Sequence, residues 1–357
     1  MFLALLWKFE ANLFLAVTYK WRAIQYGTTW YHSHIGLQAW EGLFGGIVVN
    51  GPASANYDED KGVIIKNDWD YNTVDQLFMT AQKDGPPTLD TALINGTNVF
   101  GTDGTVNQTG TRFNTSFTAE LLTDCADQVS VAKNFWLCAI PQNACSENAN
   151  PTNVKGFIYY SDSPSTPSTT AYSYTNSCID EDMSDLTPIV SETVSSPFYN
   201  KSEPVSLGKN GGSLYRLINA SGVVELPHKN VWTYVVIETW MSVPHPIHLH
   251  GHDFVVLAQG GGTYTGDVTT LASPPKRDTA MLPENGYLVI AFKTDNPGAW
   301  LMHCHIGWHT EERFAIQFVE QYSEINSLID YDNLHANCKT WDTFENGLSV
   351  KEEDSGI

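Results

Sequence analysis

Short apolar runs that end at glycine or proline constrain the fold of this chain more than any other feature. The run Tyr287–Phe292 is rich in β-branched and aromatic residues, and Asp295-Asn-Pro-Gly298 stops it shortly afterwards. Trp232–Ile237 and Phe254–Leu257 have the same character. Many short strands with such punctuation are typical of β-sandwiches and barrels. Because no amphipathic pattern reaches three helical turns, we predict an all-β protein.

Eight of the eleven histidines fall in three tight groups. The groups are His32-Ser-His34, His245-Pro-Ile-His248-Leu-His250 and His303-Cys304-His305-Ile-Gly-Trp-His309. Two long stretches that are nearly free of histidine separate them, which a random distribution would rarely produce. We interpret the remaining three, His228, His252 and His335, as ordinary core or surface residues.

The spacing within the groups predicts how the side chains point. In a β-strand, positions i and i+2 share one face and position i+1 points to the other. His303 and His305 should therefore face one way and Cys304 the other, so that one strand serves two metal sites. The other His-X-His pairs should converge in the same manner. We expect Pro246 to reorient His245, which stands three residues before its own pair.

The donor types indicate copper. Two imidazoles and one thiolate, here His245, Cys304 and His309, form the donor set of a blue copper electron-transfer centre. The six remaining imidazoles of the groups suit a copper cluster. Zinc is the main rival, but structural zinc prefers closed sets of four ligands, and a single tetrahedral ion could not use all three residues of His303–His305.

The stretches that carry these groups resemble the ascomycete laccases, a branch of the multicopper oxidases. The matching stretches are Tyr19–Pro52, His245–Phe254 and His303–His309, and the resemblance runs with gaps from residue 19 to residue 357. It implies tandem cupredoxin-like Greek-key β-sandwich domains, the first and second of them incomplete. We place a partial N-terminal domain at 1–52, a partial middle domain at 53–190 and a C-terminal domain at 191–357. The last four residues, 354–357, resemble the plug that ends the family's chains.

The resemblance also assigns ligands. It implies that His245, Cys304 and His309 hold a type 1 copper, with Phe314 in the axial position as a non-coordinating side chain. An aromatic residue there implies a high reduction potential. A type 2 copper would take His248. The implied ligands of the type 3 pair are His32, His34, His250, His303 and His305.

The family's activity is the one-electron oxidation of phenols or aromatic amines, coupled to the four-electron reduction of O₂ to water. The expected partners are therefore small aromatic substrates and O₂. A net charge of −21 excludes general binding to nucleic acids, because phosphates require a cationic partner. We expect a monomer that does not bind membranes.

Sequons and cysteines indicate a secreted glycoprotein. The five sequons stand at Asn95, Asn107, Asn114, Asn200 and Asn219. By resemblance, Cys145 and Cys178 form a disulfide of the family, and Cys338 matches a cysteine whose usual partner lies in a segment that is missing here. Cys125 and Cys138 have no counterpart and could pair with each other.

The sequence also departs from the family. The family's first copper motif, His-X-His-Gly, has no match upstream of His32, which removes one type 2 and one type 3 ligand. Further jumps fall near residues 120–125 and 214–224, and Arg313 replaces a small residue. We therefore expect residues 1–357 alone to hold fewer than the family's four coppers and to reduce little or no O₂.

Three alternative functions remain open at this stage. One is a type 1 copper electron-transfer protein that does not reduce O₂, and another is an inactive fragment that cannot fold. The third keeps the oxidase activity but changes the substrate to ascorbate or ferrous iron.

Overall fold

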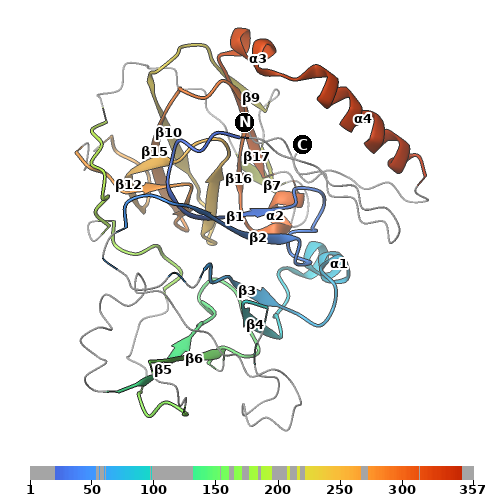
Figure 1. Ribbon diagram of the computed structural model, residues 1–357. Coiled ribbons are helices and arrows are strands. Elements are labelled where there is room, and N and C mark those ends of the chain that lie inside the picture. Colours follow the sequence, from blue (N-terminus) through green and yellow to red (C-terminus); the bar gives the residue numbers. More distant parts are fainter. Residues whose placement is uncertain are drawn as a thin grey trace.

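The structure of the protein is a computed structural model. It describes residues 21–53, 62–96, 132–152, 154–160, 165–170, 177–183, 186–194, 207–209, 215–217, 222–266, 272–312 and 314–347, together with single positions 56, 60 and 98. The C-terminal strands form two packed sheets, and the N-terminal strand pair lies between these sheets and the strands of the middle segment (Figure 1). Helices α3 and α4 lie at one side of the sheets (Figure 1).

The C-terminal part is a β-sandwich. Its four-stranded sheet has the order β10 (Trp232–Glu238), β15 (Gly286–Lys293), β12 (Phe254–Gly261) and β13 (Lys276–Arg277). Its five-stranded sheet has the order β14 (Thr279–Leu282), β11 (His245–Leu249), β16 (Gly298–Cys304), β17 (Ala315–Glu320) and β9 (Val223–Leu226). Only the β17–β9 pair among these is parallel.

The main hydrophobic core lies between these two sheets. In β11, burial alternates along the strand, so that His245, Ile247 and Leu249 are buried. Ile247 and Leu249 pack in one cluster with side chains from the opposite sheet such as Phe254 and Ile290. Period-two burial is what a strand with a single core-facing side requires. The strand β15 is buried on both faces instead, because a second apolar cluster covers its outer side.

The strands predicted from the apolar runs all form. The Asp295-Asn-Pro-Gly298 turn carries the chain from β15 in one sheet to β16 in the other. One difference concerns β12, which continues past Leu257 through Gly261 because it pairs along its length with β15. An all-β sandwich therefore accounts for the C-terminal part.

Smaller strand pairs make up the preceding parts. These are β1 (Gly27–His32) with β2 (Phe44–Val49), β3 (Lys66–Trp69) with β4 (Thr91–Ile94), β5 (Asn134–Cys138) with β6 (Lys155–Tyr159), and β7 (Leu207–Lys209) with β8 (Tyr215–Leu217). A small core of Ala92, Ile94, Ala139 and Val154 joins β4 to the segment around β5 and β6. No finding tests the domain boundaries near residues 52 and 190, which stay predictions.

The expectation that no helix reaches three turns was wrong. Helix α1 spans Val74–Asp84 and α4 spans Tyr331–Glu345, while α2 (Gly307–Glu311) and α3 (Tyr322–Leu328) are shorter. The helix α1 starts at a capping box in which Thr73 and Gln76 bond each other's backbone. It buries Val74 and Ala81, and with the partly buried Leu77 and Phe78 these residues follow the i, i+3, i+4, i+7 spacing of an amphipathic helix, which the prediction overlooked. No helix of the described residues has the length and hydropathy to span a membrane.

The predicted disulfide is confirmed. Cys145 and Cys178 are bonded, with their Cα atoms 5.0 Å apart. Cys338 is an exposed thiol on α4. Of the sequon residues, Asn95 is described and exposed, and the other four lie outside the described residues. Arg313, Cys125 and residues 354–357 also lie outside them, so the predictions for these positions are untested.

Candidate metal centres

The pairing of β11 with β16 decides which side chains meet. In this antiparallel pair, Ile247 lies opposite Cys304 and His248 lies opposite His303. Because directly opposed residues share a face, Cys304 points into the sandwich core with Ile247. His303 points to the other side with His248. One strand thus presents a thiol and an imidazole to two different regions, as the alternation rule predicts.

A first group, the thiolate centre, consists of His245, Cys304 and His309. The sulfur of Cys304 lies 3.7 Å from Nδ1 of His245 and 3.5 Å from Nδ1 of His309. The two Nδ1 atoms are 3.2 Å apart. Cys304 and His245 are fully buried. The three ligand atoms therefore lie close together, and the side chains of Cys304 and His245 are shielded from solvent.

The expected role of Pro246 was wrong. The strand β11 is regular from His245 onward and pairs with β14 at both His245 and Pro246. A spacing of three residues by itself puts His245 on the face opposite to His248. No reorientation by proline is needed.

The segment after β16 returns to the thiolate centre through α2. His309 lies in this helix, and its backbone carbonyl accepts a hydrogen bond from the Phe314 amide at 2.9 Å. The Cys304 amide donates to the Phe314 carbonyl at 3.1 Å. These bonds close a loop that holds the buried Phe314 ring 5.1 Å from the His245 ring. Phe314 thus packs against the centre and carries no donor atom.

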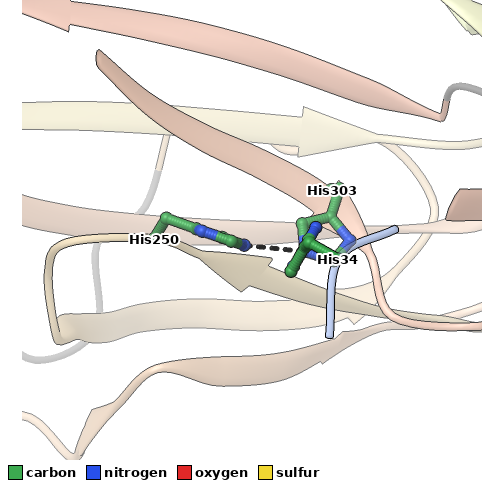
Figure 2. Close-up of side chains that lie close together, drawn as sticks. All are labelled: His34, His250 and His303. Atoms are coloured by element: carbon green, nitrogen blue, oxygen red, sulfur yellow. Dashed lines mark hydrogen bonds between the residues drawn. The ribbon is translucent and has the colours of Figure 1, made fainter. Parts of the chain in front are cut away.

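The other six imidazoles form a second group, the histidine cluster. Its best defined part contains His34, His250 and His303, whose ligand atoms all lie within 4.8 Å of one another. Figure 2 shows these three rings converging from three separate segments, with His250 Nε2 and His303 Nε2 3.1 Å apart. Sequence positions more than 260 apart are thus brought to one place by the packing of the β1–β2 pair against the sandwich.

The remaining members of the histidine cluster lie beside this triad. His32 Nε2 is 3.3 Å from His305 Nε2, and no third histidine joins this pair within the described residues at such a distance. The ring of His248 lies 5.5 Å from the rings of both His303 and His305. The structure therefore gathers one set of three donors, one set of two and a further single imidazole.

Backbone carbonyls fix the orientation of several rings. Nδ1 of His32 lies 2.9 Å from the Ser33 carbonyl, and Nδ1 of His248 lies 2.8 Å from the Asp278 carbonyl. Nδ1 of His303 is 3.0 Å from the Cys304 carbonyl. A ring nitrogen that donates to a carbonyl leaves the other nitrogen as the metal ligand. These contacts direct Nε2 of each ring into the histidine cluster.

Sequence reasoning missed Thr310. Its side chain is buried, and Oγ1 donates to the Cys304 carbonyl at 2.6 Å. The same carbonyl also contacts Nδ1 of His303. It therefore connects a residue of the thiolate centre with a residue of the histidine cluster. A lone threonine after a histidine gives no sequence signal for this contact, because the bonded partner is a backbone atom.

Comparisons with known proteins decide the family. Models of the multicopper oxidases match residues 15–54 and 188–324. Laccase-1 of Botryotinia fuckeliana is 36% identical over 96% of this chain and 74% of its own length. A laccase of Neurospora crassa is 31% identical over 95% of this chain and 70% of its own length. This chain belongs to the multicopper oxidase family, in its fungal laccase branch.

Solved structures agree with this multicopper oxidase assignment. The crystal structure of the laccase from Botrytis aclada has a TM-score of 0.79 and 30% identity, covering 93% of this chain and 77% of that one. The multicopper oxidase Fet3p has a TM-score of 0.60 at 18% identity, which shows a likeness of fold alone. The predicted all-β fold with cupredoxin-like domains is confirmed.

Copper fits the donor sets of this multicopper oxidase. The thiolate centre offers the two imidazoles and one thiolate that blue copper takes, with a non-coordinating ring at the side. A closed structural zinc site takes four ligands, whereas the described residues bring three together here. Copper also prefers imidazole donors of the kind gathered in the histidine cluster.

Burial keeps His245, His34 and His309 neutral. It lowers the pKa of His245 to about 4 and that of His34 to about 4, with the neighbouring histidines adding to the shift of His34. Burial and the adjacent His245 lower the pKa of His309 to about 3. Burial raises the pKa of the Cys304 thiol to about 12. These three imidazoles of the multicopper oxidase are thus neutral ligands at neutral pH, whereas copper binding must release the thiol proton of Cys304.

The metal-free protein should lose stability in mild acid. An exposed histidine in the unfolded chain has a pKa of about 6.5. Below that pH the unfolded chain therefore binds protons that the buried imidazoles of the folded protein do not bind, and this favours unfolding. The free energy of unfolding is therefore highest above about pH 6.5. It decreases as the pH falls toward about 4, which is the pKa of His245 in the folded protein. At pH 5 that fully buried side chain alone should cost about 2 kcal/mol.

Urea unfolding of the metal-free protein at pH 7.5 and pH 5 measures this loss. In the variant His245→Gln, the urea midpoint should differ less between the two pH values, because this variant lacks one histidine that binds a proton only in the unfolded chain. Equal urea midpoints at both pH values in the unsubstituted protein would contradict the prediction.

Proposed function

We propose that this multicopper oxidase couples the one-electron oxidation of phenols and aromatic amines to the four-electron reduction of O₂ to water. The supporting observation is the position of Cys304, whose sulfur lies in the thiolate centre while the adjacent His303 lies in the histidine cluster. A single peptide unit therefore spans the two donor sets. Such a junction suits a protein that takes electrons at one site and uses them at another.

We also propose the ligand roles that the family implies. His245, Cys304 and His309 would hold the type 1 copper, and His248 would bind the type 2 copper. The type 3 ligands would be His32, His34, His250, His303 and His305. When bound, copper supplies the one-electron redox chemistry, while the chain's residues hold and orient it.

The residues around the thiolate centre would exclude water and admit electrons from one side. Cys304 and His245 are fully buried, and Phe314 covers them from within the core. His309 is half-buried, so its ring is the member of the centre that an external aromatic substrate can approach. Beside it, Trp308 stacks on Phe78 of α1 with a centroid distance of 6.1 Å.

Two routes lead from Cys304 to His303. One follows the covalent backbone, and the other crosses the 3.0 Å contact between the Cys304 carbonyl and Nδ1 of His303. Both are short, and neither depends on a mobile side chain, because Cys304 and His303 are buried in a paired strand. We propose that electrons pass along these routes.

The cellular setting is also a proposal. Asn95, a sequon residue, is exposed, and the confirmed disulfide is typical of an oxidising compartment. We propose a secreted glycoprotein that acts on small phenols as a monomer.

Bleaching of the blue colour by a phenol tests the proposed function. Under anaerobic conditions, a copper-loaded protein should lose its blue absorption when hydroquinone has supplied one electron for each reducible copper that the protein holds. Ascorbate and ferrous iron serve as parallel reductants, and faster bleaching by either would favour that substrate. A colour that hydroquinone leaves unchanged would contradict the proposal.

A second candidate function is electron transfer without O₂ reduction. The observation that favours it is the pair His32–His305, which belongs to no group of three donor atoms within 4.8 Å of one another among the described residues. Admitting oxygen after the bleaching separates the two functions. For the protein joined to a relative's segment that carries the His-X-His-Gly motif, return of the blue colour with oxygen consumption supports the oxidase, and a colour that returns only with an added chemical oxidant supports the electron carrier.

A further inference from the structure

A buried carboxylate lies outside both metal centres. Glu320 is the last residue of β17 and is fully buried, although it could carry a charge. Its Oε2 atom lies 2.8 Å from Nε2 of His252, whose side chain is only 4% exposed. Burying a carboxylate costs free energy unless several polar groups surround it. The buried carboxylate of Glu320 therefore calls for a structural or functional explanation.

Apart from a hydrogen bond that Oε1 accepts from the side chain of the adjacent Gln321 at 2.9 Å, the contacts of Glu320 lead to one turn. Its Oε1 atom accepts a hydrogen bond from the Asn296 amide at 2.7 Å. Asn296 in turn donates from Nδ2 to the carbonyl of Gly251 at 2.8 Å. His252, on the other side of the carboxylate, directly follows Gly251 in the chain. Glu320 thus holds the chain at Gly251 from two directions.

The turn at Gly251 tolerates little change. Gly251 has a φ of +73°, a backbone conformation that residues with a side chain rarely adopt, and a Cβ atom there would clash with the Trp300 ring. The Trp300 ring is fixed because its Nε1 donates to the Asn296 carbonyl at 2.7 Å. The same asparagine therefore fixes both the turn and the ring against which the turn packs.

The turn sets the direction of His250. This histidine lies between the end of β11 and Gly251, and its amide donates to the Leu301 carbonyl at 2.8 Å. Figure 2 shows its ring extending from this turn toward His303. A shift of the turn would move His250 Nε2 away from the triad, whereas the thiolate centre lies on the opposite face of the same strands.

We propose that Glu320 is a positioning residue for the His34–His250–His303 triad, acting through Asn296 and His252 on the Gly251 turn. This inference rests on the proposed copper-binding role of the triad. It requires a hydrogen-bond acceptor at position 320 and not a negative charge. The variant Glu320→Gln should therefore retain the function that Glu320→Ala loses, because glutamine keeps an oxygen for the Asn296 amide.

Copper titration of the metal-free full chain in chelator-buffered solutions tests the proposal. In Glu320→Ala, copper binding beyond the thiolate centre should weaken by ~10–100-fold, which is typical when partners that orient metal ligands are removed. The blue absorption should change little. Glu320→Gln should bind copper nearly as the unsubstituted protein does.

Two controls separate positioning from general destabilisation. Glu225→Ala removes an exposed carboxylate from the neighbouring strand β9 and should have no effect. Phe318→Leu loosens the core on β17 itself and should lower the urea midpoint without selective loss of triad copper. Equal weakening of both centres in Glu320→Ala, or failure of Glu320→Gln to recover binding, would overturn the proposal.

A second readout covers the case in which the unsubstituted protein takes no copper at the triad. That result would count against the proposed function, and the positioning role can still be judged in the metal-free protein. Hydrogen exchange of the His250 amide should then be at least ~10-fold faster in Glu320→Ala than in Phe318→Leu, relative to amides of β15. Equal exchange in the two variants would overturn the role of Glu320.

Discussion

Replacing Cys304 by serine should abolish the blue colour of the copper-loaded protein. The colour of such a centre arises from charge transfer between a thiolate and copper, and Cys304 supplies the sulfur that lies 3.5 Å and 3.7 Å from the two Nδ1 atoms. Serine is close to cysteine in size, so the core around β16 should keep its packing. Phenol oxidation should fall to background, because the electron entry site is lost.

Visible absorption of the copper-loaded variant measures this effect. Cys338→Ser is the matched control, since it removes an exposed thiol far along α4 and should leave the colour unchanged. Blue absorption that survives in Cys304→Ser would remove this cysteine from the site. Loss of colour in Cys338→Ser would show that the assay reports folding instead of ligation.

When residues 1–357 are produced on their own, they should bind fewer than four coppers and consume little O₂. The triad offers three donors, but the His32–His305 pair offers two and His248 stands beside them as a single imidazole. Removing mere supporting groups around a metal costs ~10–100-fold in affinity or activity, and a missing ligand should cost more. The thiolate centre needs no further histidine and should still form.

Metal analysis and an oxygen electrode decide this second prediction. Fusion of a relative's segment that carries the His-X-His-Gly motif should raise both the copper content and the oxygen uptake. Four coppers per chain with rapid, phenol-dependent oxygen uptake by the unfused polypeptide would show that the donor count is wrong.

The divided use of one strand could be predicted from the sequence. The alternation rule needs only the order His303-Cys304-His305, and the register of β11 with β16 places the side chains accordingly. The apolar runs between glycine and proline gave the sandwich strands in the same way. Both inferences rest on local periodicity, which tertiary packing preserves here.

Other features could not be predicted because they depend on contacts between distant backbone atoms. The hydroxyl of Thr310 donates to the Cys304 carbonyl, and the carbonyl of Asp278 accepts from a ring nitrogen of His248; no spacing in the sequence encodes such contacts. His252 was interpreted as an ordinary residue, but its contact with Glu320 spans 68 positions of the chain. The helix α1 was missed although its apolar residues Val74, Leu77, Phe78 and Ala81 have helical spacing, so this feature was within reach of the sequence.

The central claim is that opposite faces of one strand hold copper of two kinds. Copper content and blue absorption, measured together in Cys304→Ser and His303→Ala, test it most directly. We expect Cys304→Ser to lose the colour and about one copper, and His303→Ala to keep the colour while losing copper from the histidine cluster. Loss of the colour in both variants, or in neither, would contradict the claim.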